Sequence, residues 1–283
     1  MKECASVNEN LAWTGTEMVV AGVDSGAVST KVVILLEGQP YALSQVDTRI
    51  PKESASRAMD AALAKGRLKA EDIRYVVATG CGRSQVPFAH RRVSEIPCGA
   101  AGAVRIWGPS VRTVLDAGGE SCRITHCTEK GRATAFLWND KCAAGIGRSL
   151  ESFADLAGAE PKKIGKRGLQ TDGFPKLSDF CAVYAQSEAL DLVRSKVPLE
   201  QVVTAYHYAM AKRISTLVLR LGLKEDLAII GGLAKNSGIT KWLERILEVN
   251  ALAPKAEWDP ALAPALGAAL FADSSCRGQR LGH

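Results

Sequence analysis

The sequence predicts an α/β fold with two lobes. Short apolar runs of strand length alternate with stretches whose apolar residues recur at helical spacing, which is typical of sheets flanked by helices. A unit of strand, Asp-x-Gly turn and strand occurs twice, at residues 18–36 and 112–125, and helices follow each copy. The length of 283 residues is enough for two domains, which usually hold roughly 100–200 residues each.

The first copy follows a polar leader at residues 1–17. Residues 18–23 form an apolar strand and residues 31–36 return after a polar turn, so we expect a hairpin. Further elements are expected in this order: strand 41–50, helix 55–65, strand 75–79 and helix 99–107. The first lobe is placed at residues 18–105 together with residues 262–275, where an alanine-rich segment predicts a helix that packs tightly on a sheet.

The second copy lies in the second lobe, which is placed at residues 106–261. Residues 112–115 form an apolar strand, residues 123–125 return after the second Asp-x-Gly turn, and a strand at 133–137 follows. The remaining elements are expected in this order: helices 147–156, 181–195 and 199–221, strand 227–230 and helix 239–249.

The composition is that of an ordinary soluble protein, with 47% hydrophobic and 23% charged residues. The apolar runs are shorter than the roughly 18 residues that a membrane-spanning helix needs, and the N-terminus lacks a signal-peptide pattern. A cytoplasmic location without a membrane partner is therefore expected. The net charge of +6 is mild, and the basic run at residues 162–167 is expected to be a solvated loop rather than a nucleic-acid site.

The two Asp-x-Gly turns carry the residue types that bind phosphate. Backbone N–H groups of such turns bind phosphate oxygens, and the aspartate can hold Mg²⁺ through water. A single Asp-x-Gly is also a common hairpin turn, but two of them can grip one nucleotide from both sides. A glycine pair after the strand at 227–230 adds a place where adenine or ribose can lie against bare backbone.

Two of the eight cysteines stand at the beginning of predicted helices, each after a polar turn. These are Cys142 and Cys181, and helix N-termini stabilise thiolates. We hypothesise that the two thiols are half of a ligand set and that a second subunit supplies the other half. The alternative is that both are buried helix-start residues that pack against small neighbours.

The order of these motifs resembles the superfamily of acetate and sugar kinases, heat-shock ATPases and actin. It resembles more closely the BadF/BadG/BcrA/BcrD-type ATPase family, which includes subunits of benzoyl-CoA reductases and activators of 2-hydroxyacyl-CoA dehydratases. The matching segments are residues 24–31, 79–83, 139–148, Cys181 with Ser187 and Glu188, and residues 231–236. The Asn-Asp-Lys-Cys-Ala-Ala-Gly stretch at 139–145 is the most specific. The resemblance implies a two-lobed, actin-like and ribonuclease H-like ATPase fold with duplicated mixed sheets flanked by helices.

The resemblance also implies the cofactors ATP, Mg²⁺ and one [4Fe–4S] cluster shared between two subunits. Cys142 and Cys181 are then this chain's cluster ligands. The expected catalytic residues, which handle Mg²⁺ and water, are Asp24, Asp116 and Glu120. The expected cofactor-binding residues are Ser25, Gly26, Ser29, Thr30, Lys31, Gly118, Gly119, Gly231, Gly232 and Asn236. Ferredoxin is the expected electron donor, and ATP hydrolysis drives the electron to catalytic subunits that bind benzoyl-CoA.

The second turn departs from the family pattern. Where the family usually has Asp-Ile-Gly-Gly-Gln-Asp-x-Lys, this chain has Asp-Ala-Gly-Gly-Glu-Ser-Cys-Arg at residues 116–123, so that Glu120 replaces a neutral amide. This divergence favours one member of an unequal pair: the smaller, delta-type ATPase subunit of an ATP-dependent benzoyl-CoA reductase, beside a paralogous ATPase subunit. The alternatives are a homodimeric activator of a 2-hydroxyacyl-CoA dehydratase, a cluster-free small-molecule kinase, and a subunit with an inactive nucleotide site.

Overall fold

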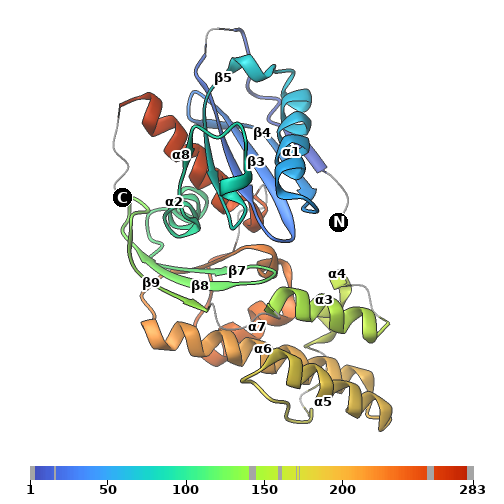
Figure 1. The fold of residues 1–283 in the computed structure, drawn as a ribbon. Helices are drawn as coiled ribbons and strands as arrows, with labels where there is room; N and C mark the ends of the chain where they lie inside the picture. Colours follow the sequence, from blue (N-terminus) through green and yellow to red (C-terminus); the bar gives the residue numbers. More distant parts are fainter. Residues whose placement is uncertain are drawn as a thin grey trace. The chain divides into compact units, whose positions relative to one another are not determined.

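The computed structural model describes residues 4–15, 17–139, 145–158, 161–169, 171, 173–253 and 258–278, with only the backbone described at 161–163. The chain divides into two units. Unit 1 comprises Met1–Val111, Cys127–Thr134 and Pro254–His283, and unit 2 comprises Arg112–His126 and Ala135–Ala253. Each unit holds one mixed sheet with helices packed on it, so the predicted α/β class with duplicated sheet units is confirmed (Figure 1).

The sheet of unit 1 has six strands in the order β1-β4-β3-β2-β5-β6. The strands are β1 Cys4–Val7, β2 Val19–Ser25, β3 Ser29–Leu36, β4 Gln39–Asp47, β5 Ile73–Thr79 and β6 Arg91–Arg92. The pair β2 and β3 is the predicted antiparallel hairpin, and β5 lies parallel to β2 on its other side. The polar leader expected at residues 1–17 contains a strand, β1. Four residues are too few for a periodic strand signal in the sequence, and they form a strand here because they pair with β4.

Helices cover both faces of this sheet (Figure 1). The helix α1, Pro51–Gly66, packs on the face that carries Val23 and Ile34. The other face meets α8, Ala263–Cys276, so closely that a Cβ on Gly22 would lie 2.1 Å from the Ala265 carbonyl oxygen. The predicted tight packing of the alanine-rich helix on a sheet is thus confirmed for α8. The helix α2, Glu95–Trp107, packs against α8 through small residues.

The sheet of unit 2 has four strands in the order β10-β7-β8-β9. Its elements are β7 Thr113–Ala117, β8 Cys122–Cys127, β9 Ala133–Asn139, α3 Ile146–Leu156, α4 Pro161–Arg167, α5 Ala182–Arg194, α6 Leu199–Leu221, β10 Leu227–Ile230 and α7 Ser237–Leu247. Strand β8 runs antiparallel to β7, whereas β10 runs parallel to it. The core of this unit joins Leu115 and Ile124 of the sheet to Tyr206 and Met210 of α6.

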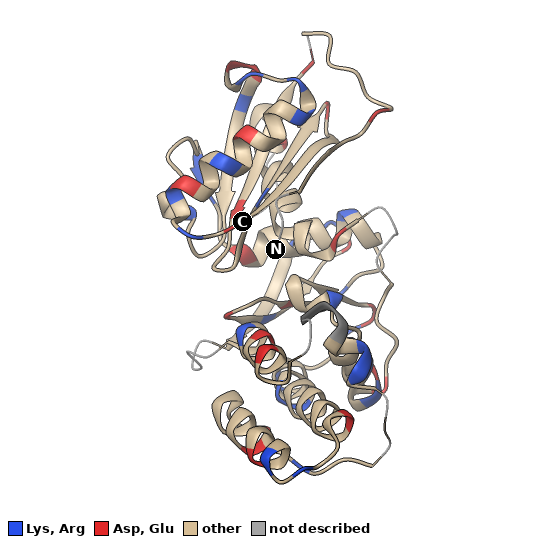
Figure 2. Cartoon of the chain, turned by 90° about the vertical axis from the view of Figure 1, so that its right-hand side faces the viewer, with Lys and Arg blue, Asp and Glu red and all other residues tan. Residues whose placement is uncertain are grey.

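The basic run at 162–167 is not the expected loop, since it lies in the helix α4. Ile164 of this helix is buried, and Gly165 lies so close to α7 that a Cβ there would be 2.6 Å from Oδ1 of Asn236. A helix of seven residues is unstable alone, so tertiary packing holds it. Helices of both units carry acidic and basic residues (Figure 2). Within the described ranges, the helices are too short or too polar to cross a membrane.

Candidate functional site

The first Asp-x-Gly turn joins β2 to β3 and places an ion pair across the hairpin. Asp24 and Lys31 are register partners, and Nζ of Lys31 lies 3.0 Å from Oδ2 of Asp24. Their side chains are only 8% and 11% exposed, so each charge needs the other. A Cβ on Gly26 would lie 2.8 Å from the carbonyl oxygen of Ser29, and therefore only glycine fits at the tip of the turn.

A second glycine loop lies directly on this turn. Gly82 donates its backbone N–H to the carbonyl oxygen of Ser25 at 2.9 Å, and a Cβ on Gly82 would lie 2.4 Å from Oγ of Ser25. Gly80 has φ +91°, where side chains are rare, and a Cβ there would lie 2.6 Å from Oδ1 of Asp24. Ser25 is fully buried, and its hydroxyl has no hydrogen-bond partner among the described residues. A bound phosphate oxygen is the kind of group that would satisfy this hydroxyl.

The other two hydroxyls of this turn differ in their surroundings. Thr30 is fully buried, and its Oγ1 lies 2.8 Å from Oγ1 of Thr48, so this hydroxyl has a protein partner. Ser29 begins β3 and is also buried. The predicted residues of the first turn are thus brought together within unit 1, with Ser25 as the hydroxyl that lacks a partner among the residues described.

The second turn, between β7 and β8, repeats the ion pair of the first. Asp116 and Arg123 are register partners, and Nη1 of Arg123 lies 3.0 Å from Oδ2 of Asp116. The side chains are 15% and 9% exposed. The guanidinium carbon of Arg123 also lies 5.1 Å from the ring centre of Trp138 on β9, in a cation–π contact. Both copies of the hairpin therefore hold a largely shielded carboxylate against a cation seven residues further along the chain.

The glycine pair after β10 lies beside the second turn. Because β10 runs parallel to β7 and pairs Ile230 with Asp116, the chain leaves both strands at the same sheet edge. Gly231 has φ +87°, and a Cβ there would lie 2.9 Å from Oδ1 of Asp116. A Cβ on Gly232 would meet nothing within 4 Å in the described part of the chain, which leaves room for a ligand. Asn236 follows and caps α7, where its Oδ1 accepts from the Ile239 N–H at 3.1 Å.

The start of α3 packs on the second turn. The backbone N–H of Arg148 donates to the carbonyl oxygen of Gly119 at 3.0 Å, and a Cβ on Gly147 would lie 2.8 Å from the carbonyl oxygen of Gly118. Nε of Arg148 also lies 2.9 Å from Oε1 of Glu120, in a half-exposed ion pair. The negative charge of Glu120 is thus partly offset by the helix that packs against it. The segment just before this helix, residues 140–144 with Cys142, lies outside the described residues.

Cys181 is the N-cap residue of α5 and is half-buried, as a free thiol. Three apolar side chains around it face solvent: Phe180 is 69% exposed, Val183 57% and Tyr184 61%. Such a patch beside a thiol suits coverage by a second protein molecule. Within the described residues no three His, Cys, Asp or Glu side chains gather as a metal site, and a cluster that takes two thiolates from each of two chains needs no such group.

Three buried titratable groups, Cys98, Cys122 and His207, are unsuited to ligand or acid–base roles. Burial raises the pKa of the Cys98 and Cys122 thiols to about 12, so both stay protonated and behave as core residues. Burial lowers the pKa of His207 on α6 to about 4, although hydrogen bonds to Val203 and Asn236 oppose the shift. His207 is therefore a neutral core histidine at neutral pH.

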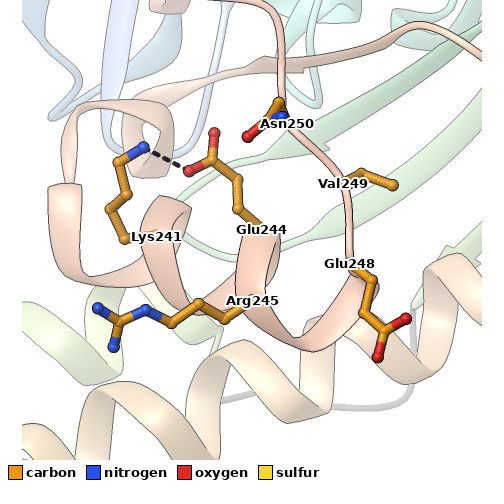
Figure 3. Close-up of a pocket in the computed structure, with 6 residues that line it drawn as sticks. All are labelled: Lys241, Glu244, Arg245, Glu248, Val249 and Asn250. Carbon is orange, nitrogen blue, oxygen red and sulfur yellow. Dashed lines mark hydrogen bonds and ion pairs between the residues drawn. The ribbon is translucent and has the colours of Figure 1, made fainter.

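One surface pocket lies away from these motifs, at the C-terminal end of α7 (Figure 3). Its volume is about 280 Å³, and Nζ of Lys241 lies 2.6 Å from Oε2 of Glu244 beside it. The lining residues are Lys241, Glu244, Arg245, Glu248, Val249 and Asn250. Since none of them belongs to the phosphate-binding turns or the glycine pair, this pocket is not the predicted nucleotide site.

Within unit 2 the structure therefore brings Asp116, Gly118, Gly119, Gly231 and Asn236 to one sheet edge. The first turn belongs to unit 1, and the prediction that both turns grip one nucleotide stays a prediction. Residues that sequence reasoning did not assign to the site are Gly80, Gly82, Arg123, Arg148 and His207. For Arg123 a signal exists, because a basic residue stands seven positions after the aspartate in each turn.

The mixed sheets and the two Asp-x-Gly turns define a protein of the actin-like ATPase fold class. The profile of the BadF/BadG/BcrA/BcrD ATPase family matches residues 21–272, and the chain belongs to this family. It is 34% identical over 256 residues to the 2-hydroxyisocaproyl-CoA dehydratase activator of Clostridioides difficile, a match that covers 90% of this chain and 95% of the relative. It is 30% identical over 262 residues to a benzoyl-CoA reductase component of Thauera aromatica, covering 89% of this chain and 92% of the relative.

A solved structure shows the same fold. The activator of the 2-hydroxyisocaproyl-CoA dehydratase from Clostridium difficile, with bound ADPNP, superposes with a TM-score of 0.86 at 32% identity, covering 94% of this chain and 100% of that chain. The neighbour thus binds an ATP analogue. Together with the family match, it supports the predicted ATP site.

Proposed function

We propose that this chain is an ATP-hydrolysing activator that passes an electron of low potential to a partner enzyme acting on acyl-CoA thioesters. The observation that carries the proposal is the packing of the second phosphate-binding turn on the start of α3, the helix that follows Cys142. A change at the nucleotide would thereby reach the start of α3, the helix that follows the expected cluster ligand in the chain. The dehydratase activator and the reductase component that resemble the chain support this class of function.

The residues of the two turns have separate tasks in this proposal. Asp24 and Asp116 would hold Mg²⁺ through water, because each carboxylate lies beside bare glycine backbone. The hydroxyl of Ser25, which has no partner in the described part of the chain, and the backbone N–H group of Gly119 would bind phosphate oxygens. The N–H group of Gly118 donates to the carbonyl oxygen of Ser121 at 2.9 Å, so Gly118 would contribute close approach of the backbone rather than a donor. The remaining expected phosphate ligands are Gly26, Ser29, Thr30 and Lys31.

The nucleoside would lie against the open backbone at Gly232, next to Gly231 and the capping residue Asn236. Its ribose and base would thus meet unit 2 at the sheet edge that also carries Asp116. Glu120 would orient water or metal, with Arg148 offsetting its charge.

Cys142 and Cys181 would hold one [4Fe–4S] cluster together with the same two residues of a second subunit. The half-buried Cys181 at a helix N-terminus fits this group, because a helix N-terminus favours a bound anionic group such as the cluster. When bound, the cluster supplies one-electron transfer at low potential. Ferredoxin is the proposed donor.

For the partner, we propose a 2-hydroxyacyl-CoA dehydratase, since the dehydratase activator shares 34% identity with the chain and the reductase component 30%. The sequence-based expectation, the smaller ATPase subunit of a benzoyl-CoA reductase beside a paralogous subunit, is the second candidate. The departure from the family pattern at Glu120 favours this second candidate. A free homodimer after anaerobic purification supports the activator, whereas a stable complex with reductase subunits supports the second candidate.

Substitution of the turn aspartates tests the ATPase assignment. In Asp116→Asn and Asp24→Asn, the rate of ATP hydrolysis should fall about a hundredfold or more, because a charged group aimed at Mg²⁺ is lost. Asp191→Asn is the matched control, since Asp191 forms an exposed ion pair with Arg194 on α5 and should leave the rate unchanged. Unchanged hydrolysis in both turn variants would contradict the proposal and favour a subunit with an inactive nucleotide site.

A further inference from the structure

His207 lies in the middle of α6, fully buried, and links this helix to the nucleoside motif of α7. Its ring is enclosed by two glycines: a Cβ on Gly168 would lie 2.6 Å from Cγ of the ring, and a Cβ on Gly238 would lie 2.6 Å from Cδ2. Both ring nitrogens have partners. Nδ1 lies 2.8 Å from the carbonyl oxygen of Val203, and Nε2 lies 3.2 Å from Nδ2 of Asn236.

The partners determine where the protons are. The Val203 carbonyl oxygen can only accept, so Nδ1 of His207 carries the hydrogen and donates it. The neutral ring then has a lone pair on Nε2, which accepts from the amide NH₂ group of Asn236. The amide oxygen of Asn236 is consequently turned toward the Ile239 N–H, which donates to it at 3.1 Å. Three hydrogen bonds thus connect the backbone of α6 to the first turn of α7.

We propose that His207 is a positioning residue for the nucleoside: as the Nδ1–H tautomer, it sets the orientation of the Asn236 amide and so the shape of the loop 231–236. The inference rests on the proposed function, in which this loop binds the adenine nucleotide. Without an acceptor at Nε2, the amide of Asn236 can turn over, and its NH₂ group would then face the Ile239 N–H. Two donors would oppose each other, and the cap of α7 would be lost.

The test compares two substitutions of His207 in the full chain. His207→Leu removes the acceptor at similar side-chain volume, whereas His207→Gln keeps a carbonyl oxygen that can accept from Asn236. The dissociation constant for the ATP analogue ADPNP should rise about tenfold in His207→Leu and stay near wild type in His207→Gln. His126→Leu is the control, because His126 is also buried and bonded through Nε2 to a backbone carbonyl, that of Gly222 at 2.8 Å. Its affinity should be unchanged.

Two further readouts separate positioning from a general effect on folding. In an Asn236→Ala background, His207→Leu should weaken binding no further, because its effect passes through Asn236. Nitrogen-15 NMR of the wild type should show the hydrogen of His207 on Nδ1. The opposite tautomer, or an additive effect of the two substitutions, would overturn the inference.

The outcomes distinguish this inference from the proposed function. A wild-type chain that does not bind ADPNP would contradict the nucleotide site and the role of His207 in it. Normal wild-type binding together with unchanged binding in His207→Leu would contradict the role of His207 alone.

Discussion

Each of the two turns holds a largely shielded carboxylate against a cation across one hairpin. The pairs are Asp24 with Lys31 and Asp116 with Arg123, both at 3.0 Å. Because the partners occupy the same register in both hairpins, the duplication extends from the strand pattern to the side-chain chemistry. The charge of each aspartate is thus compensated, which keeps a carboxylate stable at a place where water is largely excluded.

Removing one partner of the first pair should destabilise the fold. In Lys31→Met, Asp24 is left buried without a counter-charge, and the free energy of unfolding should fall by about 3 kcal/mol. The double variant Lys31→Met with Asp24→Asn should regain part of this loss, because it buries no net charge. Urea unfolding of the single and double variants measures both values, and equal stability of Lys31→Met and wild type would contradict the assigned role.

The depressed pKa of His207 predicts a pH dependence of stability. Above pH 6.5 the ring is neutral in the folded and the unfolded chain, so its contribution is fully present. As the pH falls from 6.5 to about 4, the ring takes up a proton in the unfolded chain, whereas the buried ring of the folded chain stays neutral. The free energy of unfolding therefore decreases by about 3 kcal/mol over this range. The difference in unfolding free energy between wild type and His207→Gln should therefore shrink over this window. A constant difference would contradict the shift.

The residues of the two turns could be predicted from the sequence, but several of the side chains that contact them could not. Asp116 and Gly118 stand in a pattern of adjacent residues, and such local patterns can be read directly. Arg148 meets Glu120 across 28 positions, and His207 meets Asn236 across 29. Contacts of this separation depend on how helices pack, which periodicity alone does not specify.

Among the elements, α3 packs with its first residues against the second turn, where the Arg148 N–H donates to the carbonyl oxygen of Gly119. Gly147 allows this approach, since a Cβ would lie 2.7 Å from Cα of Gly119. In an ordinary helix, replacing glycine with alanine stabilises by about 1 kcal/mol. At Gly147 we expect alanine to destabilise the fold instead, because its Cβ would contact the backbone of Gly119 and the helix or the turn would have to move.

Gly147→Ala should therefore weaken ADPNP binding and lower the unfolding free energy by about 1–3 kcal/mol. Gly173→Ala is the matched control, because its Cβ would meet nothing within 4 Å in the described part of the chain and its φ is not positive. Calorimetric titration and thermal unfolding measure the two effects. A Gly147→Ala variant as stable as Gly173→Ala, with wild-type affinity, would contradict the close contact.

The elements were predictable where the sequence carries a clear apolar pattern, including the four-residue strand β10 at 227–230. The bounds of α6, residues 199–221, agree with the sequence prediction, because twenty-three residues repeat the helical period several times before Gly222 ends it. Two short elements were missed: β1 forms by pairing with β4, and α4 is stabilised by burial of Ile164. Their sequences contain too few residues for a periodic signal.

For the whole molecule, a cluster shared between two chains requires that a second subunit covers the surface around Cys181. Val183 and Val193 both lie on α5, with 57% and 37% exposure, but only Val183 is close to the thiol in the chain. Val183→Lys should raise the dimer dissociation constant at least about tenfold, whereas Val193→Lys should leave it unchanged. Anaerobic sedimentation measures both variants. Equal effects of the two substitutions would place the interface elsewhere.

The proposal that Cys181 is a ligand of a shared [4Fe–4S] cluster is tested most directly by electron paramagnetic resonance. The anaerobically purified, reduced protein is measured, and Cys181→Ser is compared with Cys276→Ser. Cys276 is an exposed free cysteine at the end of α8 and serves as the control. A cluster shared between two chains predicts a [4Fe–4S] signal of one cluster per two chains in the wild type and in Cys276→Ser, and its loss in Cys181→Ser. An unchanged signal in Cys181→Ser, or a wild-type protein without iron, would contradict it.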